Sequence, residues 1–358
     1  MTNSTHFFLG ANSGRGFQSL FPPFCAPEQY HDLLILKGGP GAGKSTMMKA
    51  LGAALEEEGE PVEYLHCSGD PASLDGVRFP RLRTAVVDGT APHVVEPRYP
   101  AAVERYVDLG VCYDVAAAKA RREEIVRHTT ACSAAYQRAF RALAAARAMA
   151  DSAAALAVEG MDRDKLRRRG EGILSRELRG RGRGEPDQYR FLGSPTCQGP
   201  LWRFDTAADL CPRIYQLQDS YDLAAPLLEQ IRAAARGRGF YAIVCPDPEH
   251  TERIQHLLLP ELGLAFLTSR ESMRYEGSAY RRIRVDAMVP AAHYRQYRSR
   301  LRFAARMAAA LRAEAAEALA DAKRSHDALE AVYNPYVDFD GVRALAALEA
   351  GRLLSWLG

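Results

Sequence analysis

A glycine-rich segment at residues 38 to 45 constrains the fold of this chain more than any other feature. It reads Gly-Gly-Pro-Gly-Ala-Gly-Lys-Ser, which fits the pattern G-x-x-x-x-G-K-[ST] of a phosphate-binding loop. The apolar run Leu33 to Leu36 directly precedes it and is typical of a buried parallel strand. An amphipathic helical pattern follows the loop and ends at Gly59. Strand, loop and helix therefore occur in the order that a phosphate-binding loop needs.

The residue types in this loop suit a polyphosphate. Glycines permit both the backbone angles and the close approach that let N–H groups point at phosphate oxygens, and the start of the helix adds a favourable dipole. We expect Lys44 to contact the β- and γ-phosphates of ATP and the Ser45 hydroxyl to ligate Mg²⁺. The predicted nucleotide-binding residues are Gly38, Gly39, Pro40, Gly41, Ala42, Gly43, Lys44, Ser45 and Thr46.

A magnesium ion bound to phosphate also needs an acidic residue at the end of a neighbouring strand. The segment Thr84 to Asp88 has the form of such a strand, so we predict Asp88 as the second magnesium ligand, although an Asp before a glycine also suits a turn. Asp70 follows another strand-like segment. It is either a turn residue before Pro71 or a residue that holds a substrate or the attacking water. The candidate catalytic residues are Lys44, Asp88 and Asp70.

The residue that would orient water for hydrolysis is not evident. Many ATPases place a Glu directly after the metal-binding Asp, where this chain has Gly89. His66, Asp75, His93 and Glu96 lie on segments expected to leave the carboxyl ends of strands, where open α/β sheets bind ligands. Each of these is either a general base or a hydrogen-bonded turn or surface residue. A small-molecule kinase and a non-hydrolysing nucleotide-gated switch therefore stay open as alternatives to an ATPase.

A series of weak, collinear matches at an offset near 180 residues indicates that the chain is duplicated. It begins with Phe8-Leu-Gly10 against Phe191-Leu-Gly193 and keeps its order to the end of the chain. A period this long predicts two related domains rather than a solenoid. The segment aligned with the loop, residues 217 to 226, has no glycine, and its Asp219 and Asp222 would repel phosphate. We therefore expect one competent site per chain.

Each half ends in an alanine-rich helical pattern with a seven-residue repeat, at residues 125 to 150 and 301 to 332. Small apolar residues allow close packing, so we expect each helix to pack on its own domain, with a projecting arm that binds a partner protein as the alternative.

Residues 163 to 183 carry nine Lys or Arg against three acids. They predict an exposed, mobile linker, with a nucleic-acid-binding arm as the alternative. The expected domains are residues 1–162 and 185–358, joined by a basic linker at 163–184.

Composition supports an ordinary globular protein. The formal net charge of +3 is too small to indicate a nucleic-acid partner by itself. The seven cysteines are never spaced C-x-x-C, which favours reduced thiols over a disulfide framework. There is no apolar run of about 18 residues, and the first ten residues lack the features of a signal peptide. These features predict a cytoplasmic protein without a membrane partner; self-association stays possible.

With its loop, its strand ends and its opening segment taken together, the chain resembles a family of bacterial duplicated P-loop NTPases that are predicted ATPases. The resemblance is carried by the loop, by Tyr64 to Pro71, by Val87 to His93 and by the opening Phe8-Leu-Gly-Ala-Asn-x-x-x-Gly-Phe17. It implies an α/β fold with a P-loop-type parallel sheet, flanking helices and an internal duplication, and an activity that uses ATP and Mg²⁺. The family often keeps a second phosphate loop, whereas this chain departs from that pattern at residues 218 to 226.

Overall fold

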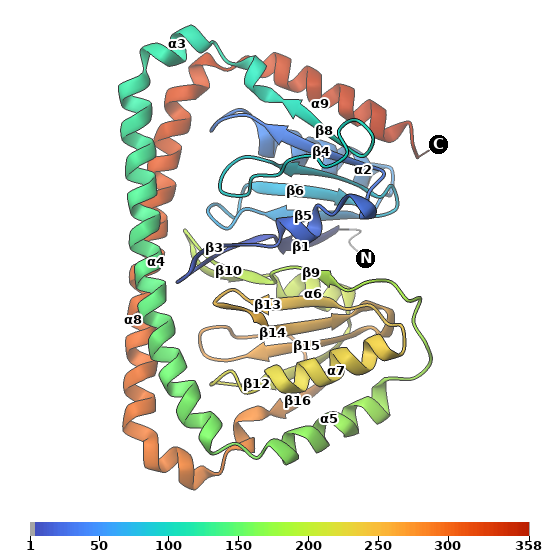
Figure 1. Cartoon of the computed structure of the whole chain (residues 1–358), viewed down its shortest axis with the longest axis vertical. Coiled ribbons are helices and arrows are strands. Elements are labelled where there is room, and N and C mark those ends of the chain that lie inside the picture. Colours follow the sequence, from blue (N-terminus) through green and yellow to red (C-terminus); the bar gives the residue numbers. More distant parts are fainter. Residues whose placement is uncertain (1–3, 358) are drawn as a thin grey trace.

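The computed structural model describes residues 4–357. Two α/β units, each built on a six-stranded mixed sheet, lie one above the other beside a pair of long helices (Figure 1). The predicted α/β class is confirmed. Within residues 4–357, no helix combines the length and the apolar character that a membrane crossing requires. All seven cysteines fall in this range and are free thiols.

The sheet of the first unit is mixed. In spatial order its strands are β1 (Ser4–Phe8), β5 (Val62–His66), β6 (Leu74–Phe79), β7 (Thr84–Asp88), β4 (Asp32–Lys37) and β8 (Glu104–Asp108). All neighbouring strands are parallel except that β6 runs antiparallel to both β5 and β7. The expectation of a parallel sheet is therefore wrong for β6. The connections on either side of β6 are too short for the crossover that a parallel pair needs.

The run Leu33 to Leu36 forms the centre of β4 and is fully buried, as the sequence predicts. Helix α2 (Lys44–Glu57) covers one face of the sheet and packs Met47, Met48, Leu51 and Leu55 onto it. Burial of each such side chain stabilises the unit by about 1.5–3 kcal/mol. The remaining elements are β2 (Gly10–Ser13), β3 (Gly16–Ser19), α1 (Phe21–Phe24), η1 (Pro27–Gln29), η2 (Leu109–Cys112) and α3 (Val115–Ala120).

The second unit has the same strand order and the same strand directions as the first. From one edge to the other its strands are β9 (Gln188–Tyr189), β13 (Ile243–Asp247), β14 (His250–Leu259), β15 (Leu264–Ser269), β12 (Arg213–Gln218) and β16 (Arg281–Arg284). Strand β14 is the antiparallel exception and takes the place of β6. The other elements are β10 (Gly193–Thr196), β11 (Gly199–Trp202), α6 (Phe204–Leu210), α7 (Ala225–Gly237), η3 (Pro260–Leu262) and η4 (Val285–Met288).

The two units share one hydrophobic core. Phe8 and Phe191, which the sequence comparison aligns, exchange two main-chain hydrogen bonds of 3.0 and 2.9 Å and are both fully buried. Beside them Glu63 of the first unit forms a buried ion pair with Arg190 of the second, and Arg78 contacts the same carboxylate at 3.2 Å. The units are therefore fixed against each other rather than tethered.

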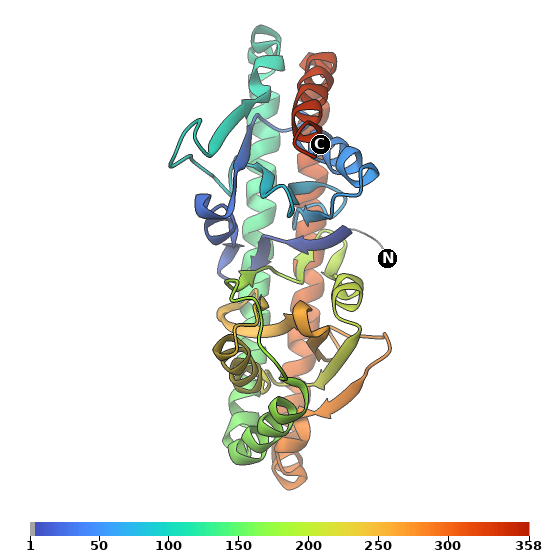
Figure 2. The ribbon, with the colours of Figure 1, turned by 90° about the vertical axis from the view of Figure 1, so that its right-hand side faces the viewer.

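The long helices α4 (Arg122–Glu159) and α8 (Ala291–Tyr333) pack on each other (Figure 2). Ala139 packs with Ala318, and Ala153 packs with Ala304, so the helices run antiparallel. The alanine repeat predicted both helices. Our expectation that each packs on its own domain is wrong, because small residues on both helices allow their backbones to approach closely.

Each helix that follows a long helix in the chain packs on the unit formed by the other half of the chain. Helix α5 (Arg163–Glu177) packs on α7 of the second unit and adds Leu166 and Ile173 to its core. The prediction of a mobile linker at 163–184 is therefore wrong for residues 163–177, whose apolar positions lie on one side of a helix. After η5 (Asn334–Tyr336), helix α9 (Phe339–Leu354) packs on α2 and buries Leu353 in the first unit. The helix that follows each long helix thus completes the unit formed by the other half of the chain.

Candidate functional site

The glycine loop connects β4 to α2 at the carboxyl edge of the first sheet. Gly41 and Gly43 have backbone φ angles of 73° and 82°, which residues other than glycine rarely adopt. A Cβ atom on Gly41 would lie 2.6 Å from the Asn334 side-chain oxygen, and one on Gly43 would lie 3.0 Å from Val342. Helix α2 begins after Gly43 without a side-chain cap. Its first N–H groups are thus available to an anion.

Lys44 and Asp88 meet beside this loop. The Lys44 ammonium donates to the carbonyl oxygens of Gly38 at 2.7 Å and Gly39 at 2.9 Å. Its Nζ lies 3.6 Å from Oδ2 of Asp88, and these two side chains are only 12% and 13% exposed. The structure therefore brings two of the three predicted catalytic residues together, with the Lys44 ammonium between the loop carbonyls and the Asp88 carboxylate.

Asp88 is placed by the sheet. Strand β7 pairs in parallel with β4, so that Asp88 lies opposite Leu36, the residue next to the end of β4. Its Oδ1 accepts hydrogen bonds from the N–H of Thr90 at 2.9 Å and from the Thr90 hydroxyl at 2.6 Å. Asp88 is therefore a turn residue through one carboxylate oxygen, while its other oxygen faces Lys44.

Ser45 lies in the first turn of α2, and its Oγ accepts the N–H of Leu74 at 2.9 Å. A hydroxyl oxygen has two lone pairs, so one remains for a cation. Thr46 beside it is exposed. Residues 4–357 contain no group of three or more His, Cys, Asp or Glu side chains suited to a metal ion. The donors present, Ser45 and Asp88, instead fit Mg²⁺, which protein sites usually hold through one or two side chains with phosphate and water oxygens.

Asp75 and His93, two of the four open candidates, adjoin Asp88. Because β6 is antiparallel, its start lies at the carboxyl edge of the parallel strands, which places Asp75 next to Asp88. His93 Nδ1 lies 3.0 Å from the main-chain oxygen of Asp88, and its Nε2 lies 3.6 Å from Asp75 Oδ1. Asp75 is buried, and its Oδ2 has no hydrogen-bond partner among the described residues. A buried carboxylate oxygen without a partner is suited to hold water or a polar ligand.

The pKa of His93 reflects two opposing effects. Burial opposes protonation of the ring, whereas the hydrogen bond to Asp75 and the charges of Asp75 and Asp88 favour it. The carboxylates prevail, so the pKa of His93 lies above its ordinary value. The ring also stacks on Phe21 with centroids 4.5 Å apart, which fixes its plane. The two carboxylates therefore stabilise the protonated, positively charged form of His93.

The other candidates have different surroundings. Asp70 Oδ1 accepts the N–H of Ala72 at 3.1 Å, and Oδ2 lies 3.4 Å from Lys323 of α8, so Asp70 is a turn residue that also contacts the helix pair. Both ring nitrogens of His66 are engaged, by Pro71 at 2.8 Å and by His6 at 3.0 Å. Burial and nearby positive charge lower the pKa of His66 to about 4.

Glu96 is the fourth open candidate, and it lies at the surface. Its carboxylate pairs with Lys37 at 2.8 Å and accepts a hydrogen bond from the Tyr106 hydroxyl. The Glu96 side chain is 63% exposed. These contacts tie it to the end of β4 and to the middle of β8 rather than to Asp88. Of the two roles considered for Glu96, the surface role therefore fits its position.

The loop is contacted by two residues that are distant from it in the sequence. Glu330, in the last turn of α8, accepts the N–H of Gly41 at 3.2 Å. The Tyr113 hydroxyl donates to the Pro40 oxygen at 2.7 Å. The sequence did not predict a role for Glu330, because a helical Glu carries no local signal of a partner 289 residues away. The Glu330 carboxylate thus accepts a hydrogen bond from an N–H group that a phosphate would need.

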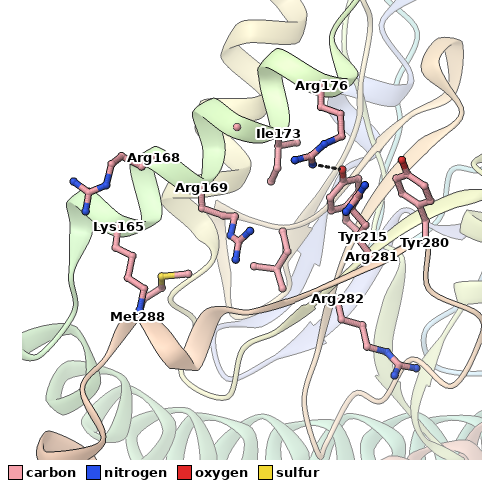
Figure 3. A pocket seen from close by; sticks show the side chains of 12 residues that line it. Lys165, Arg168, Arg169, Ile173, Arg176, Tyr215, Tyr280, Arg281, Arg282 and Met288 are labelled. Carbon is pink, nitrogen blue, oxygen red and sulfur yellow. Dashed lines mark hydrogen bonds between the residues drawn. The ribbon is translucent and has the colours of Figure 1, made fainter.

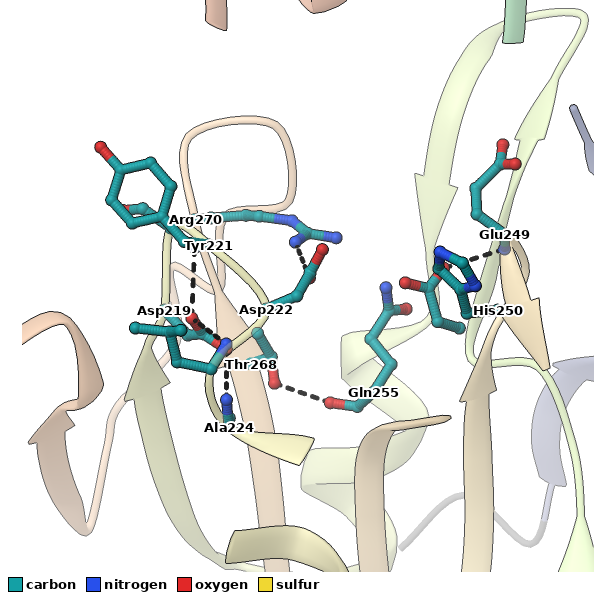
Figure 4. Close-up of polar contacts among 12 residues, drawn as sticks. Asp219, Tyr221, Asp222, Ala224, Glu249, His250, Gln255, Thr268 and Arg270 are labelled. Carbon is teal, nitrogen blue, oxygen red and sulfur yellow. Dashed lines mark hydrogen bonds and ion pairs between the residues drawn. The ribbon is translucent and has the colours of Figure 1, made fainter. Parts of the chain in front are cut away.

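The corresponding edge of the second unit holds its own carboxylate (Figure 4). Asp219 accepts the N–H groups of Leu223 at 2.9 Å and Ala224 at 2.8 Å at the start of α7, and that of Tyr221 at 3.2 Å. Burial and the charge of Asp222 raise the pKa of Asp219 to about 6. The Asp219 carboxylate therefore takes the N–H groups at the start of α7, whereas the start of α2 in the first unit has no side-chain cap. For this reason we expect no phosphate to bind at this edge.

Two further differences remove acidic groups from this second edge. Sheet register places Gln255 and Thr268 where the first unit has Asp75 and Asp88, and the Thr268 hydroxyl donates to the Gln255 main-chain oxygen at 2.7 Å. Asp222 is paired with the buried Arg270.

Comparison with protein-family models, curated proteins and solved structures found no match for this chain.

Proposed function

We propose that this chain is a P-loop NTPase that binds ATP with Mg²⁺ at a single site in its first unit and hydrolyses it. The observation that carries the proposal is the convergence of Lys44 and Asp88, 3.6 Å apart, on the uncapped start of α2 after a glycine loop. Phosphate binding uses this combination of inward N–H groups, a mobile lysine and a carboxylate on the adjacent strand.

Each group has a distinct task in the proposed site. The loop N–H groups bind phosphate oxygens, and Lys44 leaves the carbonyls of Gly38 and Gly39 to contact the β- and γ-phosphates. Ser45 and Asp88 hold the magnesium ion, which neutralises charge on the phosphates. Most of the rate acceleration then comes from positioning and electrostatic stabilisation rather than from covalent chemistry.

Asp75 is our candidate for orienting the attacking water. Its buried, unpartnered Oδ2 would accept a proton from water as the water oxygen bonds to the γ-phosphorus and the bridging oxygen leaves with ADP. His93, which contacts both Asp75 and the main chain of Asp88, holds this carboxylate in place. The missing Glu after Asp88 is thereby replaced by an acid on the antiparallel strand.

The second unit is, in this proposal, a degenerate copy of the first, whereas the duplicated P-loop NTPases that the chain resembles often keep a second phosphate loop. The equal strand order and directions of the two sheets support a duplication. Asp219 at the start of α7 and Thr268 in place of Asp88 account for the loss of the second site. The second unit would act on the first through the exchanged helices.

A nucleotide-gated switch is the second candidate, and Glu330 favours it. ATP can reach the Gly41 N–H only if the Glu330 carboxylate moves away. Because Glu330 belongs to α8, that movement would alter the helix pair that spans both units. Hydrolysis and gating are compatible, and a switch alone would bind ATP without turnover.

Binding of ATP to the full chain, measured by titration calorimetry in the presence of Mg²⁺, tests the site. Lys44→Ala should weaken binding at least tenfold, because it removes the main cation at the phosphates. Lys49→Ala is the matched control, since Lys49 lies on the same helix and donates to the Ala72 oxygen at 2.6 Å, away from the glycine loop. Equal affinity of wild type and Lys44→Ala would refute the proposed site.

A further inference from the structure

A cavity of about 600 Å³ lies between α5 and β16 in the second unit, away from the glycine loop (Figure 3). Its floor is apolar and buried, and is formed by Ile173, Tyr215, Ile283 and Met288. Its rim carries six exposed cationic side chains, Lys165, Arg168, Arg169, Arg176, Arg281 and Arg282. None of the described residues that line it is acidic.

The six cations are not neutralised by the protein. Among the described residues, none of them forms an ion pair with a carboxylate, and the polar contacts they make are to neutral groups. Arg176 donates to the Tyr215 hydroxyl at 3.2 Å, Arg282 to the Gln216 side-chain oxygen at 3.0 Å and Lys165 to the Ala287 main-chain oxygen at 2.9 Å. Arg281 lies over the ring of Tyr280. Most of their hydrogen-bonding capacity is therefore unused by the described residues.

The equivalent place in the first unit holds a charge network that the second unit does not have among the described residues. There Arg105 of β8 contacts Asp32 at 3.3 Å and also Glu349 of α9. Arg352 of α9 contacts Asp32 and lies 3.6 Å from Glu349. Two arginines and two acids thus form a closed network between the last helix and the edge of the sheet.

Register and helix position identify the counterparts of these four residues. Arg281 pairs with the third residue of β12, as Arg105 pairs with the third residue of β4. Arg176 and Arg352 each lie fourteen positions after the capping Asp of their helix. Both arginine positions of the network therefore stay arginine in the second unit.

The two acid positions do not stay acidic. The place of Asp32, the first residue of its strand, is taken by Arg213, which Glu177 neutralises at 2.8 Å. The place of Glu349, eleven positions after the helix cap, is taken by Ile173. Arg176 and Arg281 have thus lost their internal partners, and Arg168, Arg169 and Arg282 add further charge. Such an arrangement gains stability when an external anion binds.

We propose that this cavity binds a small molecule with several phosphate groups. Its volume lies in the range of small-ligand sites, about 300–1,000 Å³, and suits a compact ligand better than a long polymer. Arginine guanidinium groups bind phosphate oxygens in pairs, and five of the six cations are arginines. The site lies in the second unit, so it does not depend on the ATP site proposed above.

Titration of the full chain with inorganic tripolyphosphate tests this proposal. All proteins in the experiment carry Lys44→Ala, so that the glycine loop contributes little. The added double substitution Arg169→Gln and Arg281→Gln should raise the dissociation constant at least tenfold. The matched control is Arg295→Gln with Arg300→Gln, two exposed arginines of α8 outside the cavity, which should change it less than twofold. Circular dichroism and the melting temperature verify folding of each variant.

Equal weakening by both double substitutions would overturn the proposal, because it would indicate diffuse attraction to a basic surface. A single-stranded oligonucleotide that binds while tripolyphosphate fails to compete would also overturn it, in favour of nucleic acid. If the cavity double variant loses tripolyphosphate binding and the control does not, the proposal stands. Displacement of tripolyphosphate by ATP would then identify a nucleotide as an accepted ligand, and a failure of ATP to displace it would identify an inorganic polyphosphate.

Discussion

The carboxylate of Glu330 accepts a hydrogen bond from the main-chain N–H of Gly41, although 289 residues separate them in the chain. This contact joins the end of the long helix α8 to the middle of the glycine loop. It places a negative charge where the proposed site would bind the negative charge of a phosphate. We therefore expect entry of a nucleotide to be linked to the position of α8.

The first prediction concerns this contact. Glu330→Gln should lower the dissociation constant of Mg-ATP about three- to tenfold, because it removes a like charge from the phosphate site at a gain of roughly 1 kcal/mol. Titration calorimetry measures the effect. Glu317→Gln, an exposed Glu on the same helix, is the control and should leave the constant unchanged. Unaltered or weaker binding by Glu330→Gln would contradict a competing role for this carboxylate.

The second prediction concerns Asp75. Asp75→Asn should lower the rate constant of ATP hydrolysis about 100-fold, the usual contribution of a positioned base, while the dissociation constant of ATP changes less than threefold. Single-turnover phosphate release and calorimetry separate the two quantities. Glu96→Gln, a surface Glu near the same edge, should leave the rate unchanged. An equal rate for Asp75→Asn and wild type would remove Asp75 from the mechanism.

The third prediction concerns the interface between the units. Arg190→Met should lower the free energy of unfolding by about 3–5 kcal/mol, because it leaves the buried Glu63 carboxylate with less compensation. Denaturant titration measures this value. Arg15→Met removes an exposed pair with Glu252 and should cost less than about 1 kcal/mol. Similar losses in both variants would show that the buried pair has no special importance.

The fourth prediction concerns pH. Burial opposes ionisation of Glu63, but Arg190 and Arg78 outweigh it, so the folded-state pKa of Glu63 lies below its ordinary value of 4.5. The stability that Glu63 contributes is then fully present above about pH 4.5 and is lost as pH falls through the folded-state pKa. Glu63→Gln should have a shallower loss of unfolding free energy in this acid range. An identical slope in wild type and variant would contradict the assignment.

Local patterns predicted much of the first unit. The fully buried run Leu33 to Leu36, the glycine loop and the helix after it are signals within about 25 residues, and β4 and α2 follow them closely. The position of Asp88 beside the loop could be predicted because a strand end is also a local signal. Parallel pairing of β7 with β4 brings Asp88 close to Lys44.

The errors arose where distant segments meet. The basic composition of residues 163–177 indicated a mobile linker, because the apolar surface of α7 that orders this helix belongs to another part of the chain. The alanine repeats predicted α4 and α8 but carried no information on their partner, since alanine packs equally well on any close surface. Asp75 could not be preferred over Glu96 without the antiparallel direction of β6, which decides the edge at which its side chain lies.

The most direct test of the central claim is phosphate release from ATP by the purified full chain with Mg²⁺, run beside Lys44→Ala and Asp88→Ala. Lys49→Ala serves as the control from the same helix. We predict turnover by wild type and Lys49→Ala and a loss of at least 100-fold in both Lys44→Ala and Asp88→Ala. Turnover that persists in these two variants would contradict an ATPase site built on the Lys44 and Asp88 pair.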